Sequence, residues 1–498
     1  MTSPDERDHL VAQLDEAKAQ LDEARAQLGA QEAKLGAQEA QLTDLRQQLA
    51  TAVDAIARLS EQKDRNSTNS NLPPSSDGPG AASRGVRRPT KPKSNRKRGG
   101  QKGRRGAHRQ LVSPEHANKI IDLFPEACEG CARPLQHAPD IDARRYQCID
   151  LLLTGPWVTE WRRHAVDCVC GHSTRAPYDR EQIPASPFGP RLVSVVGAMT
   201  GVYHLSRRNA QRLLQEIFGI RVSLGALSRM ESRVSEALAS ATDEAHQDTL
   251  GAMVKHADAT SWLMAGLTMS LWTLSTKLTS FFKVFKDGAR ATIEAMFADA
   301  DGKQTGILVS DRASVFGFWP MALRQICWAH LLRLFVSFSQ RDGPVGTFGR
   351  ELLDYAALVF EYWHGFIDGT LSRDELARWM EPLQRRFEAL LARVVAAGLR
   401  GCSGSCANLL AHAPALWTFV DVAGVDPTNN LAERDLRSLV IWRRLCFGSQ
   451  SERGLRFVER VMTVAHTLRK RGRDVLQFLE HSVAAHFAGA PAPALLPA

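Results

Sequence analysis

The chain has 498 residues, 44% of them hydrophobic, and a formal net charge of +9. This length is too great for one core, so we expect three or more domains. No apolar run is long enough to span a bilayer, and the start MTSPDERDHL lacks the apolar segment of a secretory signal, so we expect a cytoplasmic protein. Nine cysteines, several in short-range pairs, favour metal binding in a reducing compartment over a disulfide framework.

Residues 1–62 are expected to form a coiled coil. Leucine recurs every seven residues from Leu14 to Leu49, and Ile56 continues the series, a seam that is buried only against another helix. The companion positions hold Ala and Gln, and Gly29 and Gly36 lower helix propensity, so the association should be modest. The alternative is a single solvated helix.

A disordered linker and a basic arm are expected over residues 63–112. The stretch NSTNSNLPPSSDGPG cannot form a core. Between Arg84 and Arg109 we count twelve Lys or Arg and no acid, so the rest of the chain carries 9 − 12 = −3. Such a segment favours an electrostatic clamp on nucleic acid over a solubilising tail. Its expected phosphate contacts are Arg96, Lys97, Arg98, Lys102, Arg104 and Arg105.

A zinc-ribbon-like module is expected over residues 113–182. Cys128 and Cys131 form one short pair and Cys168 and Cys170 another, about forty residues later. Two thiolate pairs, each at the end of a hairpin, are typical of a structural Zn²⁺ site with four sulfur ligands. The spare candidates are Cys148, His164 and His172, and the alternative is a set of buried free thiols.

Residues 183–248 show a helical pattern with a break at Phe218–Gly219 and a potential cap at Ser223. This resembles helix-turn-helix geometry, with Arg207 and Arg208 available for DNA phosphates. Ordinary helical hairpins have the same pattern, and both interpretations stay open.

A ribonuclease-H-like α/β core is expected over residues 249–335. Short apolar runs ending in Asp258 and Asp311 read as strands that each end in a carboxylate, and the element order is β-β-β-α-β-α. In this topology the first and fourth strands are neighbours, which brings both acids within reach of one cation. Either Asp alone would be read as a turn residue.

Residues 336–420 read as a helical insertion, 421–485 as the last part of the core and 486–498 as a disordered tail, which makes the fold class multidomain α+β. In DPTNNLAERDLRSL, a helix places Asn429, Asn430, Glu433 and Arg437 on one face. Glu433 could supply a third carboxylate, or the face could be a solvated one with a Glu433–Arg437 ion pair.

Together these motifs resemble the insertion sequence 66 family, a branch of the bacterial Asp-Asp-Glu transposases. The resemblance covers nearly the whole chain after the coiled coil. The similar segments are NSTNSNLPPSSD, GGQKGRRG, the cysteine pairs, HADATSW, SDRASVF, CWAHLLRLF, NNLAERDLR and FGSQSERGLRFVERVMTVAHTL. Ala259 departs from the family, which commonly has Glu after the first Asp, and so do Lys102 and Arg104, where relatives tend to show Pro and His.

The resemblance implies that Asp258, Asp311 and Glu433 are catalytic and hold two Mg²⁺ ions, with Asp258 bridging both. Water would attack first and free a 3′-hydroxyl at the element's end, and that hydroxyl would then attack target DNA. Asn430 and Arg437 would contact DNA beside Glu433. His330 and Arg333 would steady the active-site strand or contact phosphate, with a buried structural histidine as the alternative.

The implied partner is double-stranded DNA, both element ends and target, bound by a homodimer or higher oligomer near the bacterial nucleoid. Accessory proteins of the same element are further candidates, and no membrane is implied. Two other classes remain open: a structure-specific nuclease without strand transfer, and a non-catalytic DNA-binding regulator.

Overall fold

The computed structural model describes residues 4–63, 69, 111–127, 129–135, 144–149, 155–170, 172–176, 183–298 and 302–496. The chain divides into two compact units, one of Met1–Gly85 with His330–Asp354, the other of Val86–Ala329 with Tyr355–Ala498. Among the described helices, none combines the length and the apolar character needed to cross a membrane.

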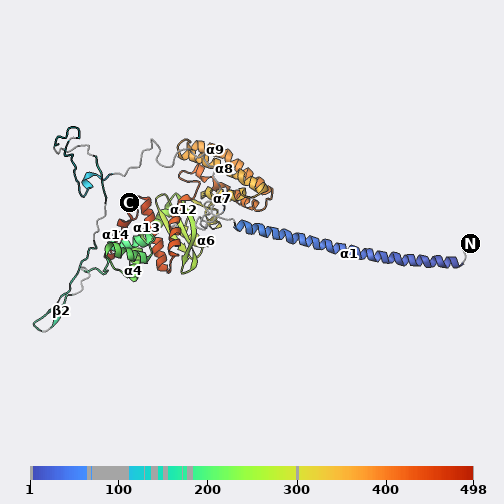
Figure 1. Cartoon of the computed structure of the whole chain (residues 1–498), viewed down its shortest axis with the longest axis horizontal. Coiled ribbons are helices and arrows are strands. Elements are labelled where there is room, and N and C mark those ends of the chain that lie inside the picture. The colour runs from blue at the N-terminus through green and yellow to red at the C-terminus, as the bar shows by residue number, and fades with distance from the viewer. Residues whose placement is uncertain are drawn as a thin grey trace. The chain divides into compact units, whose positions relative to one another are not determined.

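The N-terminal segment is one long helix, α1 (Pro4–Lys63), as Figure 1 shows. Gly29 and Gly36 do not interrupt it. The heptad residues stay in solvent, with 57% of Leu14 and 63% of Ile56 exposed. The seam therefore exists on the surface, and nothing in the described part of this chain covers it.

A small module contains two short chain reversals. Strands β1 (Ala165–Asp167) and β2 (Ser173–Arg175) form an antiparallel pair. Earlier in the chain, Ala127 and Pro134 form an isolated antiparallel bridge. A 3-10 turn, η3 (Pro114–His116), precedes both.

A helical region follows, and its boundaries are set by local capping. The side chain of Ser206 caps one helix and that of Ser223 caps the next, as expected for Ser223. Gly219 ends the first of these two helices with φ of 67°, a backbone conformation that favours glycine. The elements are α2 (Pro190–Gly197), the π-helix η4 (Ala198–Val202), α3 (Arg207–Phe218), α4 (Leu224–Ala237) and α5 (Ala239–Gly251).

The larger unit is built on a mixed five-stranded sheet with the order β5-β4-β3-β6-β7. The first strand is antiparallel to the second and parallel to the fourth, so the expected neighbour relation between the first and fourth strands is present. The strands are β3 (Val254–Met264), β4 (Leu267–Ser275), β5 (Ser280–Phe285), β6 (Ile307–Ser310) and β7 (Arg324–Ile326). The last strand is short, because a helix begins at Trp328, two residues after it.

The two faces of the sheet carry separate cores. On one face, Trp262 and Phe282 pack with Leu439 of α12 (Asn430–Cys446) and Val461 of α13 (Glu452–Lys470). On the other, Ala257 and Leu274 pack with residues of α6 (Arg290–Phe297) and of η5 (Ser314–Phe318). The 3-10 turn η6 (Met321–Leu323) precedes β7. Side chains along each strand alternate between these cores.

Helices occupy the described chain between β7 and α12. Trp328, Phe387 and Trp417 pack edge to face or tilted, with ring centroids 5.0–5.9 Å apart. The elements are α7 (Trp328–Ser339), α8 (Gly343–Ile367), α9 (Arg373–Ala396), α10 (Ser403–Ala411), η7 (Ala413–Leu416) and α11 (Thr418–Asp421).

The C-terminal residues differ from the disordered tail expected over 486–498. Helix α14 (Val475–Ala488) continues into this range. Leu495 is fully buried, and the backbone N–H groups of Leu495 and Leu496 donate to the carboxylate of Glu244 at 2.8 and 2.9 Å. A buried leucine and a carboxylate acceptor hold this segment in place.

Candidate active site

Asp258 lies inside strand β3, not at its end. The strand continues to Met264 because β4 pairs with it over nine residues, with Asp258 opposite Thr273. The interpretation of Asp258 as a strand-ending residue is therefore wrong. The polar stretch after it is strand with partly exposed side chains, and one Asp258 carboxylate oxygen accepts the N–H of Ala259 at 2.9 Å.

The register of the parallel pair places Asp258 beside Asp311. Val254 pairs with Ile307 and His256 with Val309, a constant offset of 307 − 254 = 53. The same offset leads from Asp258 to 311, one residue past the end of β6. Paired residues on neighbouring strands point to the same side of a sheet, so the two carboxylates share one face, just beyond the paired residues of β3 and β6.

That shared face is the one covered by α12. Three side chains in phase with Asp258 contact this helix or the residue just before it. His256 bonds to Asn429, Arg443 donates to the hydroxyl of Thr260 at 3.4 Å, and Trp262 packs at right angles against Trp442. Because strand side chains alternate, Asp258 also points to this side of the sheet.

Asn429, the residue before α12, ties the helix to the strand that carries Asp258. Its side chain is fully buried. The amide donates to the carbonyl oxygen of Ala257 at 2.7 Å, and its oxygen lies 3.2 Å from Nδ1 of His256. The backbone N–H of Asn429 donates to the sulfur of Cys327 at 3.1 Å, and its carbonyl accepts the N–H of Glu433. Glu433 therefore follows, one helical turn later, a residue bonded beside Asp258.

A second buried anchor on α12 is Asp435. Its carboxylate accepts hydrogen bonds from Ser275 at 2.6 Å, Ser280 at 2.8 Å and Lys470 at 2.6 Å, and His466 lies at 3.6 Å. Burial alone would raise the pKa of Asp435, but His466, Lys470 and Ser275 together hold it below its usual range. The anion joins α12 to the β4–β5 hairpin and to α13.

Asp311 is held by local contacts at the end of β6. One of its carboxylate oxygens accepts the N–H of Ala313 at 2.9 Å. Buried Arg324 donates to the Ser310 hydroxyl at 3.2 Å and to the Asp311 carbonyl at 3.1 Å. These bonds fix the backbone on both sides of the carboxylate.

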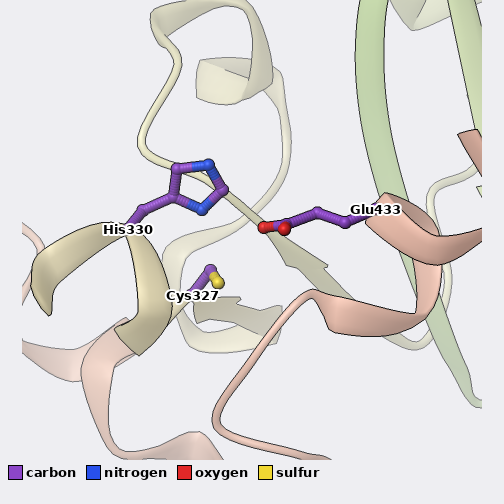
Figure 2. Close-up of side chains that lie close together, drawn as sticks. All are labelled: Cys327, His330 and Glu433. Atoms are coloured by element: carbon purple, nitrogen blue, oxygen red, sulfur yellow. The ribbon is translucent and has the colours of Figure 1, made fainter. Parts of the chain in front are cut away.

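The carboxylate of Glu433 lies with a thiol and an imidazole. Figure 2 shows the side chains of Cys327, His330 and Glu433 close together, and their potential ligand atoms are within 4.8 Å of one another. In the part of the chain that the structure describes, Asp258 and Asp311 do not belong to this cluster. The register thus places two of the expected acids on neighbouring strands, and the third lies in this separate cluster at the start of α12.

The DNA-contact candidates have different surroundings. Arg207 forms an ion pair with Glu231 at 2.5 Å, which neutralises much of its charge. Arg208, Asn430 and Arg437 are exposed. The basic-arm candidates, Arg96, Lys97, Arg98, Lys102, Arg104 and Arg105, lie outside the described residues.

The predicted zinc ligands lie in the two chain reversals. Cys168 and Cys170 are in the connection between β1 and β2, and Cys131 lies between the bridged residues Ala127 and Pro134. All three are exposed, and Cys128 is outside the described residues. Hydrogen bonds from the backbone and then the thiol of Cys170 lower the pKa of Cys168, which favours the thiolate form that zinc binds.

Sequence reasoning missed the supporting residues His256, Cys327 and Asp435. It placed Asn429 on the polar face of the helix with Glu433, whereas Asn429 precedes α12 and is fully buried.

Comparison with known families gives two matches. A model described as "Transposase IS66 family" matches residues 185–457, and one described as a family of unknown function (DUF6444) matches residues 1–110. None of the curated proteins compared with the chain matches it. The first match spans 457 − 184 = 273 of 498 residues and includes the whole sheet and α12.

Proposed function

Because the chain belongs to the IS66 family of transposases, we propose that it cuts the ends of an insertion sequence and joins them to target DNA, with Asp258, Asp311 and Glu433 as its catalytic acids. The observation that carries this proposal is the register of β3 and β6, which sets the two aspartates side by side beneath α12. The strand order β5-β4-β3-β6-β7 supports a ribonuclease-H-like core for the same domain.

The donor set fits Mg²⁺. Asp258, Asp311 and Glu433 offer only hard carboxylate oxygens, and the register aligns the first two on one face of the sheet. These three residues would hold two ions, which when bound activate a nucleophile and stabilise the leaving oxygen. Glu433 would leave the vicinity of Cys327 and His330 when it joins the aspartates.

Residues of α12 and the residue before it would hold Glu433 in place and contact the DNA. Asn429 and Asp435 fix the start of α12, so Glu433 is held near the strand that carries Asp258. Exposed Asn430 and Arg437 flank Glu433 on this helix and would contact the phosphates beside the scissile bond. In the proposed reaction, water displaces the 3′-oxygen from phosphorus. The freed 3′-hydroxyl then attacks a phosphorus of target DNA and displaces the 3′-oxygen of the target strand, which leaves as a hydroxyl.

The remaining modules would serve DNA binding. The basic arm would neutralise phosphates through its twelve cations, and the four thiols Cys128, Cys131, Cys168 and Cys170 would hold a structural Zn²⁺. The long helix α1 would join two copies on DNA through its leucine seam.

The test uses the purified full chain, Mg²⁺ and DNA fragments that carry the sequences bounding the gene. Asp258→Asn, Asp311→Asn and Glu433→Gln should each abolish cleavage while DNA binding persists, because each keeps the side-chain shape but removes a charge. The exposed Glu361→Gln on α8 is the matched control and should cleave normally. Normal cleavage by any of the three variants would remove that residue from the site, and cleavage without joining would indicate a nuclease.

A further inference from the structure

The outer face of α12 carries a row of arginines next to Glu433. The exposed residues of this helix are Asn430, Arg434, Arg437, Ile441, Arg444 and Leu445, which contain three cations and no acid. Their spacing of three and four residues puts them on one face. We call Arg434, Arg437 and Arg444 the arginine stripe. Arg437 is one turn beyond Glu433, so the stripe begins beside the proposed catalytic acid.

An exposed aromatic residue stands at the far end of this stripe. Phe447, the residue after α12, has 73% of its surface exposed. Its φ of 55° is in the left-handed region, where a side chain other than glycine is disfavoured by roughly 1–2 kcal/mol. Glycine is the usual residue at this position of a helix end. The helix thus ends in an aromatic residue at a position where the backbone conformation favours glycine, which has no side chain.

The loop after α12 holds Phe447 in this orientation. The N–H of Ser449 donates to Leu263 of β3, and its carbonyl accepts the N–H of Ala265, both at 2.8 Å. Gly448, which lies between Phe447 and Ser449, has φ of 82°, and a Cβ on it would overlap the carbonyl oxygen of Leu263. Because Gly448 packs closely against the end of β3, the backbone at Phe447 is fixed and its exposed side chain faces solvent.

We propose that Phe447 stacks on a DNA base that has left the duplex while the arginine stripe binds the neighbouring phosphates. The inference rests on the proposed function, which supplies DNA at Glu433. Three arginines without an acid complement the phosphate backbone. An exposed ring stacks on the π-face of any base, but bases in a duplex expose only their edges, so the ring requires an unpaired base.

The experiment compares two DNA probes of the same mixed sequence, one fully paired and one forked with unpaired arms, at one salt concentration without divalent metal. The ratio of the two affinities is measured, because the basic arm contributes to both. The wild-type chain should prefer the forked DNA. In Phe447→Ala, the affinity for forked DNA should fall by about 5- to 100-fold and the affinity for paired DNA should not change. The preference is then lost. Phe447→Tyr, which keeps a ring, should retain it.

Two further variants separate binding from folding. Phe447→Gly should unfold at the same or a higher temperature, because glycine accepts this backbone, and should still lose the preference for forked DNA. Trp379→Ala removes another exposed aromatic side chain, on α9, and should leave the preference intact.

An unchanged ratio in Phe447→Ala would overturn the proposal. Equal loss on both probes would also overturn it, since Phe447 would then contact duplex DNA. The assay contains no metal and measures no cleavage, so it is independent of the acid variants. A chain that prefers forked DNA but never cleaves would disprove the proposed function and leave this site standing.

Discussion

The side-chain amide of Asn429 donates a hydrogen bond of 2.7 Å to the carbonyl oxygen of Ala257, the residue just before Asp258. The two partners are 172 residues apart in the chain, and both are buried. This bond sets the distance between the helix that carries Glu433 and the strand that carries Asp258. The side chain makes no capping bond to α12, so positioning is its role in the contacts described.

Replacing Asn429 should therefore affect both stability and activity. Asn429→Ala leaves the Ala257 carbonyl and His256 without this partner, and we expect a loss of about 1–3 kcal/mol in the free energy of unfolding. Denaturant unfolding measures it, and cleavage should fall as well. Asn430→Ala, at the exposed next position, should stay within about 0.5 kcal/mol. Equal stability of the two variants would contradict the anchoring role.

Because of His204, the free energy of unfolding should fall as the pH drops from 6.5 toward 4. Its ring packs against Trp442 of α12 at 5.0 Å, and burial, followed by the charges of Arg469 and His466, lowers its pKa from 6.5 to about 4. The unfolded chain binds this proton at a higher pH than the folded one. The stabilising contribution is therefore complete above pH 6.5 and is lost as pH falls toward 4.

The check is denaturant unfolding of His204→Asn across that pH range. Asparagine tolerates the positive φ of 58° at this position. The variant should show a shallower dependence of stability on pH between 6.5 and 4 than the wild type. The exposed His481→Asn on α14 should keep the wild-type slope. A His204 variant with that same slope would show that the histidine titrates normally.

Protein purified without chelator should contain one zinc per chain by elemental analysis. Cys168→Ser/Cys170→Ser should lose the metal, because it removes two of four sulfur ligands. Cys148→Ser, at an exposed cysteine outside the assigned set, should retain it. Zinc-free wild-type protein would refute the site, and full zinc in the double variant would move the assignment to other ligands.

The seam on α1 should matter for pairing DNA ends. We expect a chain that is partly monomeric when free and at least dimeric on its ends, where two copies are held at high effective concentration. Leu21→Glu/Leu28→Glu places charges in the seam and should weaken the dimer in light scattering of the DNA complex. Ala19→Glu/Ala26→Glu adds the same charge on the opposite side of the helix and should not. A monomeric wild-type complex at saturating DNA would rule out the dimer.

Local signals predicted part of the site and distant contacts determined the rest. The apolar run before Asp311 marked a strand end correctly, and Ser223 and Gly219 marked helix ends, because strand burial and capping act over a few residues. The strand around Asp258 was misjudged because its polar second half is held by pairing with β4. The burial of Asn429 and Asp435 could not be seen, since it depends on distant strands: Ala257 lies 172 residues from Asn429, and Ser275 lies 160 residues from Asp435.

The register of β3 and β6 also determines which changes in chain length the protein can accept. Removing one residue between Val254 and Asp258 would turn the carboxylate to the opposite side of the sheet, into the apolar core that contains Ala257. The helices between Trp328 and Leu416 are under no such constraint from strand register, because this chain returns to β7 late, where Leu416 accepts a hydrogen bond from Gln325 and the hydroxyl of Thr418 donates to the carbonyl of Arg324. Relatives of this protein should therefore differ in length after Cys327 and keep a fixed spacing from Val254 to Asp258.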